Sequence, residues 1–132
     1  MERRLILTAD PIQIHSVIQS SGHSGKSGAV VHFAGLVRDL EGDQLISAID
    51  YEAFEEMAER QFHKLFDVVE QRWPVESIVL IHRIGVVQVD QPSLWVEVAA
   101  PHRQEAFAAC QWLIDAMKRV VPIWKRPLPV PR

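Results

Sequence analysis

The sequence predicts an α+β fold in which helices pack on an antiparallel-rich sheet. Two long segments carry apolar residues at helical spacing, and several short segments carry the apolar or alternating residues typical of strands. The predicted strands come mostly in runs between the helices, an order that favours antiparallel pairing over a regular alternation of strands and helices. A length of 132 residues is enough for one domain with its own hydrophobic core.

Apolar residues predict where most of the strands lie. The segment 28–37 is apolar at nearly every position, which predicts a strand buried on both faces. In the segment 45–54, Ile49 and Tyr51 share one face, and Asp50 and Glu52 share the other. The polar residues 38–43 between these two segments are typical of a turn. The expected strands are Arg3–Thr8, Gly28–Val37, Leu45–Phe54, Ser77–Ile84, Val86–Val89 and Leu94–Ala100.

Helical spacing predicts one long helix over 55–73 and another over 103–121. Glu55 and Glu56 favour the N-terminal end of the first helix through the helix dipole. Pro74 and Pro122 follow the two segments and end them, because proline cannot continue a helix. The apolar stripe of the second helix is formed by Phe107, Cys110, Leu113, Ile114, Met117 and Val121.

The rest of the chain is expected to be less regular. Asp10 and Pro11 are typical of a helix start, so a short helix is expected to follow them. The stretch 20–28 is rich in glycine and serine and indicates a flexible linker. The residues after Pro122 contain three prolines, which predict an extended or disordered tail.

The end of the linker, Gly25-Lys26-Ser27, matches the last part of a phosphate-binding loop. The first glycine of that motif is missing, since Ser20 stands in its place. A strand rather than a helix is also predicted to follow the segment, whereas a phosphate-binding loop opens a helix. The linker interpretation is therefore preferred to a nucleotide site.

Composition excludes several classes of protein. The formal net charge is −3, which disfavours a general nucleic-acid binder. The single cysteine allows no disulfide within the chain and fits a reducing, cytoplasmic setting. The longest apolar runs are too short to span a bilayer, and the first residues lack the apolar run of a signal peptide. Neither a membrane nor a nucleic-acid partner is expected.

Several basic residues stand at the ends of predicted elements. Arg38 follows a strand, His102 and Arg103 begin the last helix, Lys118 lies near its end, and Lys125 and Arg126 follow Pro122. Free N–H groups at a helix start and arginine side chains suit a phosphate. On an acidic chain this placement indicates an anionic small molecule. The alternatives remain open: Lys118 can merely complement the helix dipole, and His102 can merely cap the helix.

The length of the last helix limits how these residues can act together. Fifteen residues separate Arg103 from Lys118, so they lie about 22 Å apart at 1.5 Å per residue. They cannot contact one small substrate within one subunit. If both serve one site, two copies of the chain must build that site, as in a two-fold dimer.

Other reactive residues have ordinary interpretations. Cys110 lies within the apolar stripe of the last helix with no histidine or lysine one turn away, which favours a buried structural thiol over a nucleophile. The histidines show no spacing typical of a metal site, so no metal is expected. Asp50 and Glu52 could pair as acid and base, but a solvated sheet face is the preferred interpretation.

Five segments of this sequence resemble, in order and spacing, motifs of the large, catalytic subunit of molybdopterin synthase. Together they cover nearly the whole chain from about residue 10 to residue 126, and the set is specific although no single piece is. The segments are Gly28–Asp39, Ile49–Phe54, Ile81–Gly85, Pro101–Phe107 and Pro122–Arg126.

The resemblance implies an α/β hammerhead fold and a homodimer in which each large subunit binds one small, ubiquitin-like sulfur carrier, giving a heterotetramer. The carrier would donate sulfur from a C-terminal Gly-Gly thiocarboxylate. The acceptor would be the cyclic pyranopterin monophosphate called precursor Z, which becomes the dithiolene molybdopterin in molybdenum cofactor biosynthesis. The activity implied is thus that of a sulfurtransferase that needs no cofactor of its own.

The resemblance also implies roles for particular residues. Lys118 and Lys125 correspond to catalytic lysines, and they would also contact the substrate. The other implied substrate-binding residues are Leu36, Val37, Arg38, His102, Arg103, Arg126 and Pro127. Leu36 and Val37 would contribute their backbone groups.

The end of the chain departs from the pattern of the resembling family. Pro127 stands where many relatives have an acidic residue, and many relatives continue well beyond this point. Residues 1–126 are therefore expected to form the domain, and residues 127–132 a proline-rich extended tail. The departure motivates an alternative function, a non-catalytic homodimer of the same fold that binds pterin or phosphate.

Overall fold

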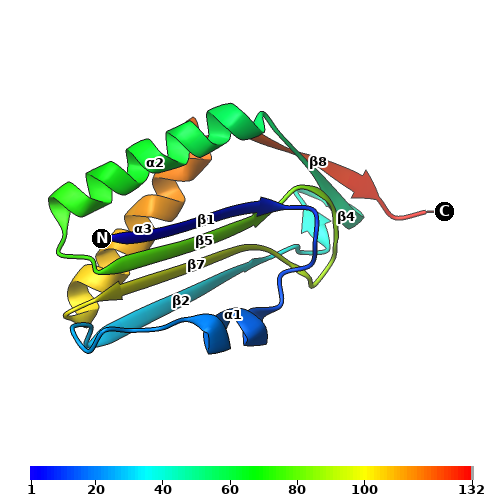
Figure 1. Ribbon diagram of the computed structural model, residues 1–132. Helices are drawn as coiled ribbons and strands as arrows, with labels where there is room; N and C mark the ends of the chain where they lie inside the picture. The colour runs from blue at the N-terminus through cyan, green and yellow to red at the C-terminus, as the bar shows by residue number, and fades with distance from the viewer. Residues whose placement is uncertain (132) are drawn as a thin grey trace.

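The computed structural model describes residues 1–131 and shows an α+β fold of three helices and eight strands, which confirms the predicted fold class (Figure 1). The helices are α1 (Ile14–Ser20), α2 (Glu55–Arg72) and α3 (Arg103–Val120). The strands are β1 (Glu2–Thr8), β2 (Ala29–Leu36), β3 (Leu40–Glu41), β4 (Gln44–Ala53), β5 (Ser77–Arg83), β6 (Gly85–Gln88), β7 (Pro92–Ala100) and β8 (Ile123–Pro129).

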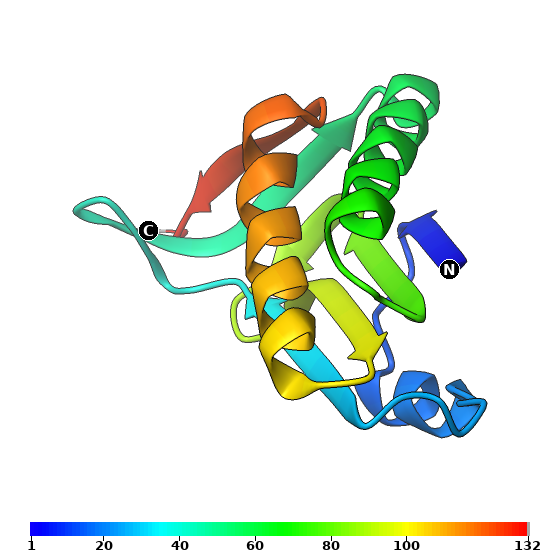
Figure 2. The ribbon, with the colours of Figure 1, turned by 90° about the vertical axis from the view of Figure 1, so that its left-hand side faces the viewer.

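Four strands form the main sheet in the order β1-β5-β7-β2. β1 runs parallel to β5, whereas the β5–β7 and β7–β2 pairs are antiparallel. The long helices α2 and α3 cover one face of this sheet, and the short α1 lies against the other (Figures 1 and 2). The main core lies under the two long helices, where fully buried side chains include Phe62, Phe66, Leu80, Val96 and Leu113.

A second, smaller sheet continues from one end of the main sheet. Its central strand β4 pairs with β3, β6 and β8, and Figure 1 shows β4 and β8 beyond that end. A small core of Val37, Ile46, Ile49 and Val87 holds this part together. Because β8 follows α3 directly, the second sheet lies beside the C-terminal end of α3.

Both long helices lie close to their predicted bounds. α2 begins with Glu55 and Glu56, as the helix dipole favours, and ends two residues before Pro74. α3 begins after His102, whose backbone N–H donates to Glu105 Oε2 at 3.0 Å. Phe107 departs from the predicted apolar stripe, since it is 61% exposed. Within residues 1–131, no helix is long and apolar enough to cross a membrane.

The prediction that residues 28–37 are buried on both faces is wrong. β2 is an edge strand, with β7 as its only neighbour in the main sheet. Val30 and Phe33 are each 37% exposed, and Leu36 is 53% exposed. An apolar strand is typical of a sheet interior, so the sequence pattern did not distinguish it from an edge strand whose apolar side chains face outward.

The short helix begins later than Asp10 and Pro11 predict. It starts at Ile14 with Gln13 at the N-cap, and the Asp10 N–H donates to the hydroxyl of Thr8 at 3.0 Å. Residues 21–28 contain no helix or strand and lead into β2 rather than into a helix. This context agrees with the linker interpretation and not with a phosphate-binding loop.

The C-terminal residues 123–129 are extended, as predicted, and form β8 along β4. Residues 127–129, expected to belong to a tail, therefore continue a strand of the second sheet, and residue 132 lies outside the described residues. Proline is tolerated on β8 because β8 is an edge strand. The predicted turn at 38–43 contains β3, which joins β4 through a tight turn at Gly42 with φ of 62°.

Candidate active site

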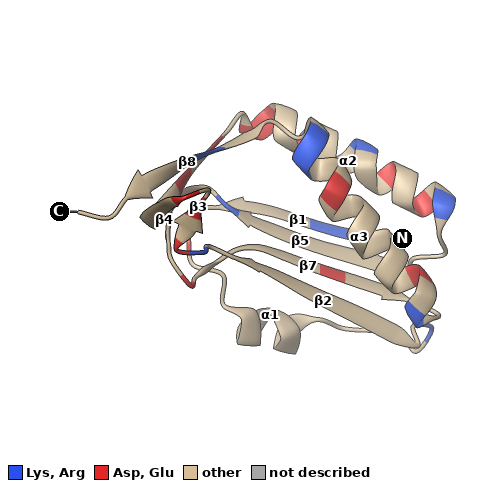
Figure 3. Ribbon diagram, turned by 180° about the vertical axis from the view of Figure 1, so that it is seen from behind, with Lys and Arg blue, Asp and Glu red and all other residues tan. Residues whose placement is uncertain are grey.

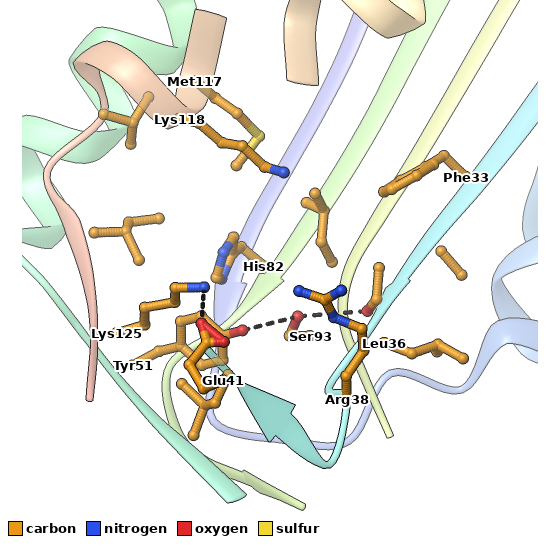
Figure 4. A pocket seen from close by; sticks show the side chains of 16 residues that line it. Phe33, Leu36, Arg38, Glu41, Tyr51, His82, Ser93, Met117, Lys118 and Lys125 are labelled. Carbon is orange, nitrogen blue, oxygen red and sulfur yellow. Dashed lines mark hydrogen bonds and ion pairs between the residues drawn. The ribbon is translucent and has the colours of Figure 1, made fainter. Parts of the chain in front are cut away.

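A cavity of about 720 Å³ opens beside the last turn of α3, between the main sheet and the second sheet. We refer to it as the pocket. Elements that are far apart in the sequence build its walls, and their side chains are shown in Figure 4. The residues that line it are Phe33, Ala34, Gly35, Leu36, Arg38, Glu41, Ile49, Tyr51, His82, Ser93, Leu94, Met117, Lys118, Val121, Ile123 and Lys125.

Three cationic side chains enter the pocket from different elements. Arg38 follows β2, Lys118 lies in the last turn of α3, and Lys125 lies on β8, and all three point toward the same space in Figure 4. Among residues 1–131, Arg38 and Lys118 make no ion pair or side-chain hydrogen bond within the chain, so their charges are free for a ligand. Elsewhere, charges of both signs are spread over α2 and α3 (Figure 3). The pocket is thus a cationic site on an acidic chain.

Lys125 and Arg126 are neighbours in the sequence, but only Lys125 lines the pocket. Successive side chains of a strand point to opposite faces, so Arg126 leaves the other face of β8. There its guanidinium donates to Asp50 Oδ2 at 3.0 Å. Asp50, which the sequence analysis considered as one half of an acid–base pair with Glu52, is therefore held in an ion pair with Arg126. Pro127 lies opposite Ile49 in the β4–β8 pairing and does not line the pocket.

The segment Leu36–Arg38, to which the resemblance assigns substrate binding, is only partly available to a ligand. Leu36 and Arg38 line the pocket. Val37 between them is 2% exposed and belongs to the core of the second sheet. Its N–H donates to the Gln91 carbonyl at 3.1 Å, and its own carbonyl accepts from the Asp90 N–H at 2.8 Å. Val37 therefore fixes the loop, while its neighbours face the cavity.

His102 and Arg103 lie at the opposite end of α3 from the pocket. Both are exposed, and neither is a lining residue. The His102 imidazole lies 3.4 Å from Glu105 at the start of the helix. Lys118 and Arg103 are therefore not brought together within one chain, in agreement with the length argument from the sequence.

Sequence reasoning did not place Glu41, His82 or Ser93 in the site, although all three line the pocket. Tyr51 was recognised only as an apolar-face residue of its strand. Its hydroxyl donates to Ser93 Oγ at 3.3 Å, and Ser93 donates to the Gly35 carbonyl at 3.4 Å. The one available signal was His82, which lies inside the matched segment Ile81–Gly85.

His82 is a buried imidazole on the pocket wall. It is 6% exposed, and its Nδ1 lies 2.7 Å from the Arg83 carbonyl, so Nδ1 carries the proton and donates it. Burial lowers the pKa of His82, and the bond to Arg83 only partly opposes that shift. The pocket therefore holds a neutral imidazole beside three cations near neutral pH.

The lowered pKa of His82 predicts a loss of stability in mild acid. Below the unfolded-state pKa, about 6.5, the unfolded chain binds a proton that native His82 does not, so the free energy of unfolding falls as the pH falls. His82→Gln should show a smaller decrease in this free energy between pH 7 and pH 5, measured by urea unfolding. His23→Gln removes an exposed histidine and should keep the wild-type decrease. Parallel curves for wild type and His82→Gln would contradict this assignment.

Cys110 is a structural thiol rather than a reacting group. It lies on the buried face of α3, is 4% exposed within the main core, and is not a lining residue of the pocket. Burial raises the pKa of its thiol to about 11, so the nucleophilic thiolate is scarce at neutral pH. Any sulfur chemistry in the pocket therefore does not use this cysteine.

Comparison with solved structures defines the class of protein. A crystal structure of molybdopterin synthase from Staphylococcus aureus superposes with a TM-score of 0.86 at 30% identity, covering 96% of this chain and 92% of that one. A solved complex of subunits 1 and 2 of molybdopterin-converting factor from Helicobacter pylori has a chain with a TM-score of 0.77, covering 95% of this chain and 83% of that one. At 20% identity, this second likeness is one of fold.

Sequence comparison then gives the family. A family model described as "MoaE protein" matches residues 7–120. The molybdopterin synthase catalytic subunit of Nostoc sp. is 37% identical over 127 residues, covering 96% of this chain and 76% of that protein. The chain belongs to the family of molybdopterin synthase catalytic subunits, the sulfurtransferases of molybdenum cofactor biosynthesis. This confirms the resemblance drawn from the sequence motifs.

Proposed function

We propose that the pocket is where sulfur passes from the C-terminal Gly-Gly thiocarboxylate of a small carrier to precursor Z. The observation that carries this proposal is the convergence of Lys118 and Lys125 on one cavity that also has apolar walls. A thiocarboxylate is an anion on a narrow, extended peptide end, and a partly apolar cationic pocket suits it. Two such transfers give the dithiolene of molybdopterin.

The lysines supply the chemistry in this proposal. Lys118 and Lys125 stabilise negative charge as the thiocarboxylate sulfur attacks the pyranopterin. A lysine in a partly apolar pocket can also move a proton, because its three donors rotate and its pKa responds to the surroundings. Arg38 binds the phosphate or the pterin of the acceptor through its planar fork of donors.

A second copy of the chain completes the site. His102 and Arg103 are exposed basic residues with no place in the pocket of their own subunit. An antiparallel arrangement of two α3 helices about a two-fold axis places the start of one helix beside the end of the other. Phe107 and Phe33, which are 61% and 37% exposed, give α3 and the neighbouring β2 apolar surface for this contact. The homodimer thereby carries two shared sites.

The sulfur donor is a separate, ubiquitin-like small subunit. The Helicobacter pylori complex contains two kinds of subunit, and one of its chains shares the present fold. This likeness supports a complex with a small subunit. In the proposed assembly each large subunit binds one carrier, which gives a heterotetramer in the cytoplasm. Because the sulfur arrives on the partner, the reaction needs neither Cys110 nor a cofactor.

A direct test mixes the protein with thiocarboxylated carrier and precursor Z and measures molybdopterin through the fluorescence of its oxidised product. The expected result is product in proportion to carrier consumed. The alternative function, a non-catalytic homodimer, predicts binding of precursor Z with no fluorescent product. Carrier that ends in an ordinary carboxylate serves as the control and should give none.

A further inference from the structure

Among residues 1–131, Glu41 contributes the only carboxylate that lines the pocket. Its Oε1 accepts a hydrogen bond from Lys125 Nζ at 2.5 Å, and Figure 4 shows the two groups side by side within the cavity. The hydrogen bond from Lys125 lowers the pKa of Glu41, and the charges of Lys125 and Arg38 add to that effect against partial burial. The carboxylate is therefore ionised at neutral pH.

The position of Glu41 in the fold allows its side chain to move away from Lys125. It ends the two-residue strand β3, which is joined to β4 by the pairs Leu40–Leu45 and Glu41–Gln44, with one further hydrogen bond from the Ile46 N–H to the Asp39 carbonyl at 2.9 Å. Leu40 and Leu45 are 46% and 58% exposed, so few apolar contacts fix this hairpin. The side chains of Lys125 and Glu41 are 55% and 23% exposed, so water reaches the ion pair, and its partners can exchange for other ions.

We infer that Glu41 is a displaceable counter-ion that holds Lys125 in the empty pocket and gives way to the anionic end of the carrier, a role that rests on the proposed function. The side-chain carboxylate of glutamate has the same chemistry as the C-terminal carboxylate of the spent carrier. Glu41 competes with both the incoming thiocarboxylate and the outgoing carboxylate for one ammonium group. It thereby weakens binding of the carrier terminus and speeds release of the spent carrier.

This role predicts opposite changes in two kinetic constants. Glu41→Gln removes the competing charge but keeps an oxygen that can accept from Lys125. KM for the thiocarboxylated carrier should fall about three- to fivefold, the size of effect expected for an exposed ion pair. The turnover number should also fall where release limits the rate, while the rate of a single turnover stays at the wild-type value. Glu41→Asp keeps the charge on a shorter side chain, so its KM for the carrier should lie between the values of wild type and Glu41→Gln.

Asp67→Asn is the matched control. Asp67 forms an ion pair of the same kind with Arg3 at 2.5 Å, but on α2 and outside the pocket. The substitution changes the net charge of the chain by the same amount as Glu41→Gln. Both constants should therefore stay at their wild-type values in Asp67→Asn, which separates a local effect of Glu41 from a change in overall charge.

A calorimetric titration with unreactive carrier gives the decisive comparison. The probes are the small subunit with its natural Gly-Gly carboxylate and the same protein with a C-terminal amide. Glu41→Gln should bind the carboxylate form about three- to fivefold tighter than wild type does and the amide form no tighter. Equal or weaker binding of the carboxylate form by Glu41→Gln would overturn the counter-ion role and leave the proposed function standing. No binding of either form by wild type would overturn both.

Discussion

Lys118→Ala should reduce the turnover of molybdopterin formation by a factor of about 100 or more, the loss typical of removing one group that stabilises charge in a transition state. Lys118 lines the pocket from the last turn of α3 and has no ion-pair partner among residues 1–131. Its ammonium is therefore available to the reacting anion. Because the residue is exposed and alanine is a good helix former, the free energy of unfolding should change little.

Arg119→Ala is the matched control for this experiment. Arg119 is the next residue of α3, is also exposed and basic, and does not line the pocket. It should keep turnover close to that of wild type. Circular dichroism and urea unfolding show whether each variant is folded. A folded Lys118→Ala protein with wild-type turnover would remove Lys118 from the catalytic machinery.

The features of the fold that were predictable from the sequence are those set by local patterns. Helical spacing and a following proline located α2 and α3 to within one or two residues. The position of β2 at the edge of the sheet was not predictable in this way, because the burial of its apolar residues depends on which strands lie beside it. β3 was missed for a related reason, since its two residues form a strand only by pairing with β4.

The residues of the site also fall into those that local sequence patterns predict and those that only the tertiary structure reveals. Arg38, Lys118 and Lys125 were predictable because each is a basic residue at the end of an element or within a matched motif. Glu41 carries no such local signal, and it reaches the pocket only because the second sheet folds against the main one. His82 lies within a matched motif, but the sequence did not show that its strand places it on the pocket wall. The opposite directions of Lys125 and Arg126 likewise required the strand that contains them, since the sequence offered them as a basic pair.

Mixed dimers test whether the site is shared between two subunits. Arg103→Ala and Lys118→Ala proteins should each be inactive alone, because each lacks one residue of every site. In a mixed dimer, one site receives Lys118 from the Arg103→Ala subunit and Arg103 from the Lys118→Ala subunit, so that site is intact. The other site lacks both residues. Random pairing of equal amounts makes half of the dimers mixed, so activity should recover to about a quarter of the wild-type value.

The geometry of α3 makes this outcome specific. At about 22 Å apart, Arg103 and Lys118 of one chain cannot contact the same small substrate, so recovery requires residues from two chains. Separate affinity tags on the two variants allow the mixed dimers to be isolated and assayed for molybdopterin, and purified mixed dimers should reach about half of the wild-type activity. Each variant paired with itself is the control and should stay inactive. Purified mixed dimers that remain inactive would show that Arg103 and Lys118 do not meet in one site across the dimer.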